Sequence, residues 1–214
     1  MTVNFDRVAS PYRWLEYASF GPYLARCRRA QLPHLPASRR ALILGDGDGR
    51  FTARLLRSNP SLSADVVDSS SAMLRLLQGR IRATAAWQQH RIRLCHADAL
   101  EWSPAGSYDL VVTHFFLDCL FPGQLTLLMD RLLPHLEQGT QWIVSEFAVL
   151  PAGPGFYLSA SLVSALYQAF GLLTGLAVRK LPEHASLFES RGFELAREIR
   201  FLGGLLRSQL WSLP

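Results

Sequence analysis

Ala41-Leu-Ile-Leu-Gly-Asp-Gly-Asp-Gly49 is the stretch that decides the fold of this chain. A short apolar run that ends in alternating glycines predicts a buried strand entering a tight turn, because glycine allows a ligand to approach the backbone closely. The next residues, Arg50 to Arg57, are predicted to form a helix whose N-terminus faces that ligand.

A second apolar run closes on an acid at Val66-Val67-Asp68, about twenty residues further on. A carboxylate at the end of the neighbouring strand can accept two hydrogen bonds from a ribose diol. The two features together indicate a cofactor that carries a nucleoside. The alternative is that Asp68 caps the following helix. A nicotinamide-dependent dehydrogenase is disfavoured, because the spacing is Gly-x-Gly-x-Gly and not Gly-x-Gly-x-x-Gly.

Apolar runs alternate with helical periodicity along the chain, which predicts an α/β fold with a mostly parallel, doubly wound sheet. One helix is predicted to start at Pro122 and to end at Gly139. Gly203-Gly204 predicts a hairpin, so that the last strand would run antiparallel. The expected strands are 42–44, 64–67, 92–94, 110–113, 141–145, 193–201 and 205–213, with further helices at 73–81, after a cap within 69–71, and at 182–191, before Gly192.

Length and composition predict a single domain over residues 1–214: 49% of the residues are hydrophobic and 18% are charged. We divide it into an N-terminal helical cover (1–38), a cofactor-binding core (39–148), an apolar helical insertion (149–181) and a C-terminal helix with a hairpin (182–214). The net charge of +5 rests on arginine, with one lysine, Lys180, among 22 basic residues. Because no basic run exceeds two residues, the arginine excess indicates a general compositional bias rather than a surface that binds nucleic acid.

Residues 147–178 contain no charged side chain or histidine, and a run of this length could span a bilayer. Pro151, Pro154 and several glycines favour instead a buried or substrate-covering helix over 156–176. Contact of that helix with a second subunit or with a membrane surface stays open, so we expect a monomer or a homodimer without a transmembrane span. An odd number of cysteines without metal-like spacing, and no signal-peptide pattern, favour a cytoplasmic protein.

The chain resembles the class I methyltransferases that use S-adenosylmethionine, over about residues 40–148. The resemblance rests on Leu44-Gly-Asp-Gly-Asp-Gly49, Val67-Asp-Ser-Ser-Ser-Ala-Met-Leu74, Ala97-Asp-Ala99, Tyr108-Asp-Leu-Val-Val112 and Leu136-Glu-Gln-Gly139. Two short end segments are Phe5-Asp-Arg-Val-Ala-Ser-Pro-Tyr12 and Arg191-Gly-Phe193 with Gly203-Gly204. They are similar to segments of the ubiquinone/menaquinone biosynthesis methyltransferases. The resemblance implies a Rossmann-like seven-stranded sheet with the last strand antiparallel, and methyl transfer to a small acceptor.

The resemblance also implies how the cofactor would lie. Its methionine part would contact the glycine turn and its ribose the end of the second strand, and the adenine would lie beyond. The residues so implied are Gly45, Asp46, Gly47, Asp68, Ser69, Met73, Asp98, Ala99 and His114. Met73 could equally be core, and Asp98 a turn former. The family usually has an acid two positions before the first glycine, where this chain has Ile43.

The segment after the fourth expected strand, His114 to Cys119, should leave the sheet beside the glycine turn. His114 is a candidate general base, since an ordinary histidine pKa of about 6.5 suits proton removal near neutral pH; the alternative is packing beside the cofactor. Asp118 could orient His114, contact the substrate or cap the next turn. Cys119 is disfavoured as a nucleophile, because transfer from a sulfonium needs no covalent intermediate. The histidines show no ligand spacing, so we expect no metal.

Aromatic side chains on the N-terminal segment and the insertion could wall an aromatic or lipophilic acceptor, although ordinary helix packing would explain them too. They are Tyr12, Trp14, Phe156, Tyr157 and Tyr167. Few charges accompany them, which disfavours nucleic acid as the acceptor. An aminopropyl transferase-like enzyme and a non-catalytic protein that binds S-adenosylmethionine remain the alternatives.

Overall fold

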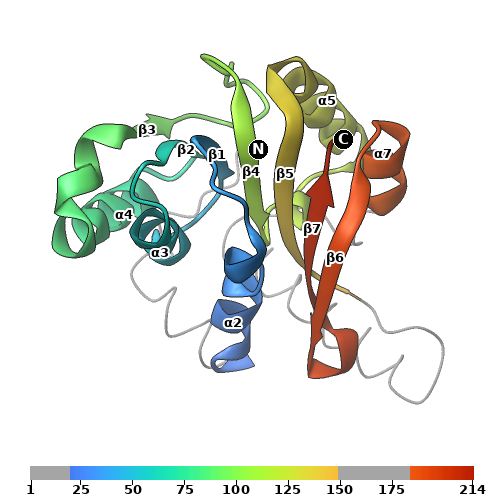
Figure 1. Cartoon of the computed structure of the whole chain (residues 1–214), viewed down its shortest axis with the longest axis horizontal. Helices are drawn as coiled ribbons and strands as arrows, with labels where there is room; N and C mark the ends of the chain where they lie inside the picture. Colours follow the sequence, from blue (N-terminus) through green and yellow to red (C-terminus); the bar gives the residue numbers. More distant parts are fainter. Residues whose placement is uncertain (1–19, 149–183) are drawn as a thin grey trace.

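Seven strands form one sheet in the order β3-β2-β1-β4-β5-β7-β6 (Figure 1). The computed structural model describes residues 20–148 and 184–214. The strands are β1 Arg40–Leu44, β2 Ser63–Asp68, β3 Ile92–His96, β4 Tyr108–His114, β5 Leu136–Phe147, β6 Glu194–Phe201 and β7 Leu206–Ser212.

Strand directions confirm the predicted α/β fold with its antiparallel last strand. The strand β1 lies between β2 and β4 and is parallel to both, while β7 is antiparallel to β5 and to β6. The predicted hairpin lies between β6 and β7, where Gly203 and Gly204 have φ values of 68° and 106°. The sequence-based strand positions are correct, but most of the strands extend beyond the predicted ends.

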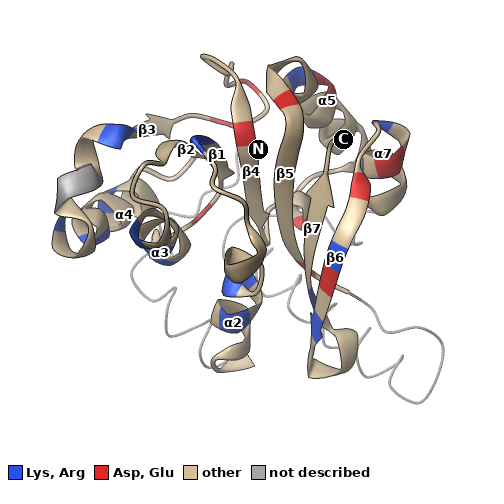
Figure 2. Cartoon of the chain, in the orientation of Figure 1, with Lys and Arg blue, Asp and Glu red and all other residues tan. Residues whose placement is uncertain are grey.

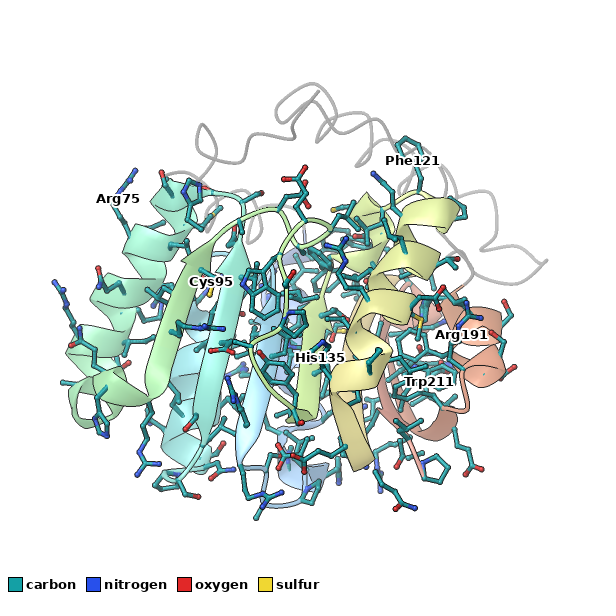
Figure 3. All side chains as sticks on the ribbon, turned by 90° about the horizontal axis from the view of Figure 1, so that it is seen from above. Arg75, Cys95, Phe121, His135, Arg191 and Trp211 are labelled. Atoms are coloured by element: carbon teal, nitrogen blue, oxygen red, sulfur yellow. The ribbon has the colours of Figure 1, made fainter. Side chains whose placement is uncertain are left out.

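Helices cover both faces of the sheet (Figure 1). One core packs Ala41 and Ile43 of β1 against α3 and α4, and a second packs Leu42 and Leu44 against α5 and α7. Trp211 of β7 belongs to the second core (Figure 3). Burial on both faces explains the continuous apolar runs. The helices are α2 Tyr23–Arg29, α3 Arg50–Ser58, α4 Ser71–Thr84, α5 Pro122–Leu132 and α7 His184–Ser190, with 3₁₀ turns η1 Leu32–His34, η2 Ala86–Arg91, η3 Leu117–Cys119, η4 Leu133–His135 and η5 Leu202–Gly204.

The prediction that Gly139 ends the helix from Pro122 is wrong. The helix α5 ends at Leu132, and β5 already begins at Leu136. Pro134 explains the early stop, since it has no N–H for the helical ladder and disfavours a helical residue before it. Gly139 lies inside β5 with a φ of 83°, and its N–H donates to the carbonyl of Leu213.

Several predictions fall on residues outside the described ranges: the first part of the N-terminal cover, with Tyr12 and Trp14, and the insertion, with Phe156, Tyr157 and Tyr167. Within residues 20–148 and 184–214, no helix combines the length and the apolar character needed to cross a membrane.

Candidate functional site

The glycine turn follows β1 at the carboxyl edge of the sheet, where the strand order reverses between β1 and β4. Such a switch point is where open α/β sheets bind ligands. Gly45, Gly47 and Gly49 have φ values of 66°, 63° and 77°, a region that side-chain-bearing residues rarely adopt. A Cβ on Gly45 would lie 2.7 Å from Cδ2 of Phe116, so the turn also fits closely against the segment after β4.

Asp46 turns its carboxylate inward and holds the first turn of α3. Its Oδ2 accepts hydrogen bonds from the backbone N–H of Thr52 (3.0 Å) and from the Thr52 hydroxyl (2.6 Å). The N-cap of α3, Gly49, has no side chain for this purpose, so Asp46 satisfies an N–H that the helix leaves open. Among the described residues, the buried Oδ1 of Asp46 has no hydrogen-bond partner. Burial raises the pKa of Asp46 from 3.8 to about 6.

Asp48 connects the glycine turn to two helices. Its carboxylate pairs with Arg50 of α3 (2.8 Å) and Arg80 of α4 (2.9 Å), and its carbonyl also accepts from Arg80. Both acids of the turn therefore have structural partners. Ile43, where the resemblance leads one to expect an acid, is fully buried in the core under α3 and α4.

We expect Asp46→Asn to remove a pH dependence of stability. The pKa of Asp46 is higher in the folded protein, so its favourable contribution is present below pH 3.8 and is lost as the pH rises through about 6. From pH 4.5 to pH 7 the variant should therefore gain stability relative to the wild type, by about 2 kcal/mol at most. Urea unfolding of both proteins at the two pH values measures this. If the difference in unfolding free energy between the variant and the wild type is the same at both pH values, the pKa of Asp46 is not raised.

The ends of β2 and β3 bring the predicted nucleoside contacts to the same edge. Asp68 ends β2, and its Oδ1 accepts from the N–H of Ser70, which caps α4. The carbonyl of Asp68 accepts from Ala97. Asp98 is exposed and accepts from the N–H of Leu100, so it does form a turn. Of the other predicted contacts, Ser69 is exposed between Asp68 and the cap, whereas Met73 and Ala99 are buried.

His114 ends β4 and is buried beneath α3 rather than exposed at the edge. Its ring packs edge-on against Phe51 of α3, with centroids 4.3 Å apart, and its Nδ1 lies 2.9 Å from Oγ of Ser145. Burial and then the charge of Arg28 hold the pKa of His114 well below 6.5. The imidazole is therefore neutral near pH 7. This geometry favours the packing role for His114 over that of a general base.

A buried pair of carboxyl groups lies beside the segment after β4. Glu146 of β5 accepts from the N–H of Leu117 at 3.0 Å, and Asp118 lies in the same turn of chain, η3. Burial and then the charge of Asp118, to which it is hydrogen-bonded, raise the pKa of Glu146 well above 4.5. A proton shared by Glu146 and Asp118 accounts for their burial side by side and for the raised pKa of Glu146, because two adjacent buried carboxylates cannot both ionise.

Sequence reasoning missed Glu146, although it found Asp118. It also missed Arg28 of α2, whose guanidinium lies 5.2 Å from the ring centroid of Phe115 and whose charge acts on His114 and Asp46. Phe115 itself has a φ of 52°, which is unusual for an aromatic residue and marks a constrained backbone at the end of β4.

The predicted residues at the strand ends thus share one edge and follow the strand order along it: Asp98 after β3, Asp68 at the end of β2, the glycine turn after β1 and His114 at the end of β4. The turn leaves its backbone close to any ligand, and α3 presents its N-terminus there. Asp68 ends β2, and Met73, an apolar side chain, follows in the first turn of α4. Together, these groups fit a cofactor that combines a polar tail, a ribose and a base.

Comparison with known proteins agrees with this geometry. A family model described as Methyltransferase domain matches residues 42–141. A malonyl-[acyl-carrier protein] O-methyltransferase of Paenibacillus sp. (strain JDR-2) is 27% identical over 159 residues, which are 71% of this chain and 54% of that protein. The chain therefore spans about half the length of this curated relative.

Solved structures share the fold. The mitomycin 7-O-methyltransferase MmcR superposes with a TM-score of 0.71 at 16% identity, over 99% of this chain and 61% of that one. The N-methyltransferase NodS from Bradyrhizobium japonicum, solved with S-adenosylhomocysteine, gives 0.62 at 15% identity, over 95% of this chain and 88% of that one. These structures show the fold that the sequence predicted, and the family model agrees with the resemblance to methyltransferases.

Proposed function

We propose that this chain, whose residues 42–141 match a model described as Methyltransferase domain, is a class I methyltransferase that transfers a methyl group from S-adenosylmethionine to a small acceptor. The observation that carries the proposal is the glycine turn at the switch point of the sheet, with Asp68 at the end of the neighbouring strand. The cofactor would supply an activated methyl group on a sulfonium. The protein then has to bind the cofactor and the acceptor, orient them toward each other and keep water out of the site.

In this proposal the backbone of Gly45, Asp46 and Gly47 lies against the methionine part of the cofactor. Asp68 and Ser69 hold the ribose, and the adenine lies between Met73, Asp98 and Ala99. The half-buried position of Asp68 supports this, since one oxygen can keep the Ser70 turn while the carboxylate faces the edge. Asp46 acts through its side chain on α3 and only through its backbone on the ligand.

For catalysis we propose alignment of the acceptor as the main contribution, a term that can supply about 7–11 kcal/mol. His114 and Asp118 are both buried, at 3% and 5% exposure, and the imidazole has a lowered pKa. We propose that His114 shapes the floor of the site from beneath Phe51 and that Asp118 positions the segment after β4. These roles of His114 and Asp118 are consistent with an acceptor that needs no protein base in the transfer step.

The acceptor we propose is aromatic or lipophilic. The uncharged sequence from 148 to 178 and the aromatic residues Tyr12, Trp14, Phe156, Tyr157 and Tyr167 support this choice. The curated relative is named for malonyl-[acyl-carrier protein] and one structural neighbour for mitomycin, so acceptors differ among proteins with this fold. A cytoplasmic location is part of the same proposal, supported by three free cysteines.

Binding of S-adenosylhomocysteine measured by calorimetry tests the proposal. We expect saturable binding that Asp68→Ala weakens by about 1.5–3 kcal/mol, the range for a hydrogen bond to a charged group. Asp130→Ala, on the far side of the sheet in α5, should leave the affinity unchanged. Thermal unfolding shows whether the Asp68 variant is folded. Binding of NAD without any response to S-adenosylhomocysteine would overturn the proposal.

A further inference from the structure

The helices on one face of the sheet carry a strongly one-sided charge. Each of α2, α3 and α4 contains three arginines, and none of the three contains an acidic residue. Figure 2 shows blue without red on these helices, whereas α5, α7 and β6 carry red. A compositional excess of arginine would spread over the whole surface, so this segregation indicates a surface that attracts anions.

Six of these nine arginines line one groove of about 270 Å³ between the three helices: Arg28, Arg29, Arg50, Arg54, Arg57 and Arg80. Ala25, Phe51, Ala53 and Thr84 also line it. The volume is below the usual range for a drug-sized ligand, so the groove fits a compact anionic group rather than a whole cofactor. Guanidinium groups bind phosphate oxygens with paired, parallel N–H donors, which makes arginine the preferred residue for such groups.

Acidic neighbours balance only part of this charge. Asp48 pairs with Arg50 and Arg80. On the outer wall, Arg54 and Arg57 are exposed side chains of α3 that make no hydrogen bond or ion pair within the described ranges, 20–148 and 184–214. Guanidinium groups facing one groove repel one another, and a bound anion with two or more charges would relieve that repulsion.

We propose that the groove between α2, α3 and α4 binds a phosphate-bearing anion. The groove is separate from the proposed cofactor edge but is linked to it, because Asp48 belongs to the glycine turn and holds two of the groove arginines. An anion that takes Arg50 and Arg80 away from Asp48 loosens the turn. Bound anion therefore lowers the affinity for S-adenosylhomocysteine, and the reverse holds by thermodynamic linkage.

Pyrophosphate is the probe, titrated by calorimetry into the whole chain without other ligands at low ionic strength. The double variant Arg54→Gln/Arg57→Gln removes two charges from the groove and leaves Asp48 and its partners intact. We expect one saturable site in the wild type and at least about tenfold weaker binding in this variant. Because no cofactor is present, the result is independent of the proposed methyl transfer.

The matched control is Arg75→Gln/Arg82→Gln, which removes the same charge from exposed positions of α4 outside the groove. Arg75 projects away from the body of the molecule (Figure 3). Equal loss of binding in both double variants, or no saturable site in the wild type, would overturn the proposal, because it would leave only unspecific attraction between charges. An unchanged S-adenosylhomocysteine affinity at saturating pyrophosphate would overturn the linkage through Asp48.

Two sources could present the phosphate group, and sedimentation with vesicles distinguishes them. Vesicles of phosphatidylglycerol that carry down the wild type and the Arg75/Arg82 control, but not the Arg54/Arg57 variant, assign the groove to a lipid headgroup. A protein that binds pyrophosphate and ignores the vesicles has a groove for a free phosphorylated molecule.

Discussion

Gly49→Ala should lower the free energy of unfolding by about 2–5 kcal/mol, measured by urea denaturation. Gly49 has a φ of 77°, and a left-handed backbone costs a residue with a Cβ about 1–2 kcal/mol. The new Cβ would also lie 2.8 Å from Cα of Leu77, where α4 packs against the turn. Such overpacking costs about 1–3 kcal/mol, because a backbone atom cannot move aside as a flexible side chain can.

The matched control is Gly79→Ala. Gly79 lies inside α4 with no atom near its missing Cβ and has a helical backbone, so alanine should stabilise the protein by about 0.5–1 kcal/mol. Opposite signs at two glycines 30 residues apart in the chain would show that the third glycine of the turn is required for close packing. A loss below about 1 kcal/mol for Gly49→Ala would contradict the close contact of α3 with α4.

Much of this fold could be predicted because its signals are local. The apolar run 41–44, the glycines after it and Asp68 lie in short segments whose strand, turn and strand-end positions follow from neighbouring residues. The end of α5 was predicted wrongly for the same reason: Leu136 continues the helical spacing, yet it pairs with Tyr108 in the sheet. Pro134 was the local signal that should have ended the helix.

The site could be predicted only as far as single segments determine it. Which atoms Asp46 and His114 contact depends on α3 lying over the ends of β1 and β4, a packing arrangement that no spacing in the sequence reveals. Asp118 was recognised, but its partner Glu146 comes from the next strand, 28 residues later. Residues that act together across strands become visible only when the strand order and register are known.

Substitutions of Glu146 should therefore change the stability of the protein strongly, and the direction of the change should depend on the new side chain. Glu146→Ala leaves backbone N–H groups of Leu117 and Phe116 without their carboxylate, and each buried unsatisfied N–H costs about 1–3 kcal/mol. We expect a loss of about 3 kcal/mol or more in urea unfolding at pH 7, together with loosening of η3. Glu146→Gln keeps an oxygen for Leu117, and its amide N–H can donate to Asp118 in place of the shared proton. This variant should be as stable as the wild type or more stable.

The pH dependence separates the shared proton from simple packing. The pKa of Glu146 is raised in the folded protein, so the folded state keeps a proton that the unfolded chain releases near pH 4.5. Its stabilising contribution is present below that pH and is lost as the pH rises through the folded pKa. From pH 4.5 to pH 8, Glu146→Gln should thus gain stability relative to the wild type. Glu189→Gln, at an exposed position of α7, should show no such gain. A constant difference between Glu146→Gln and the wild type across this range would mean that Glu146 and Asp118 do not share a proton.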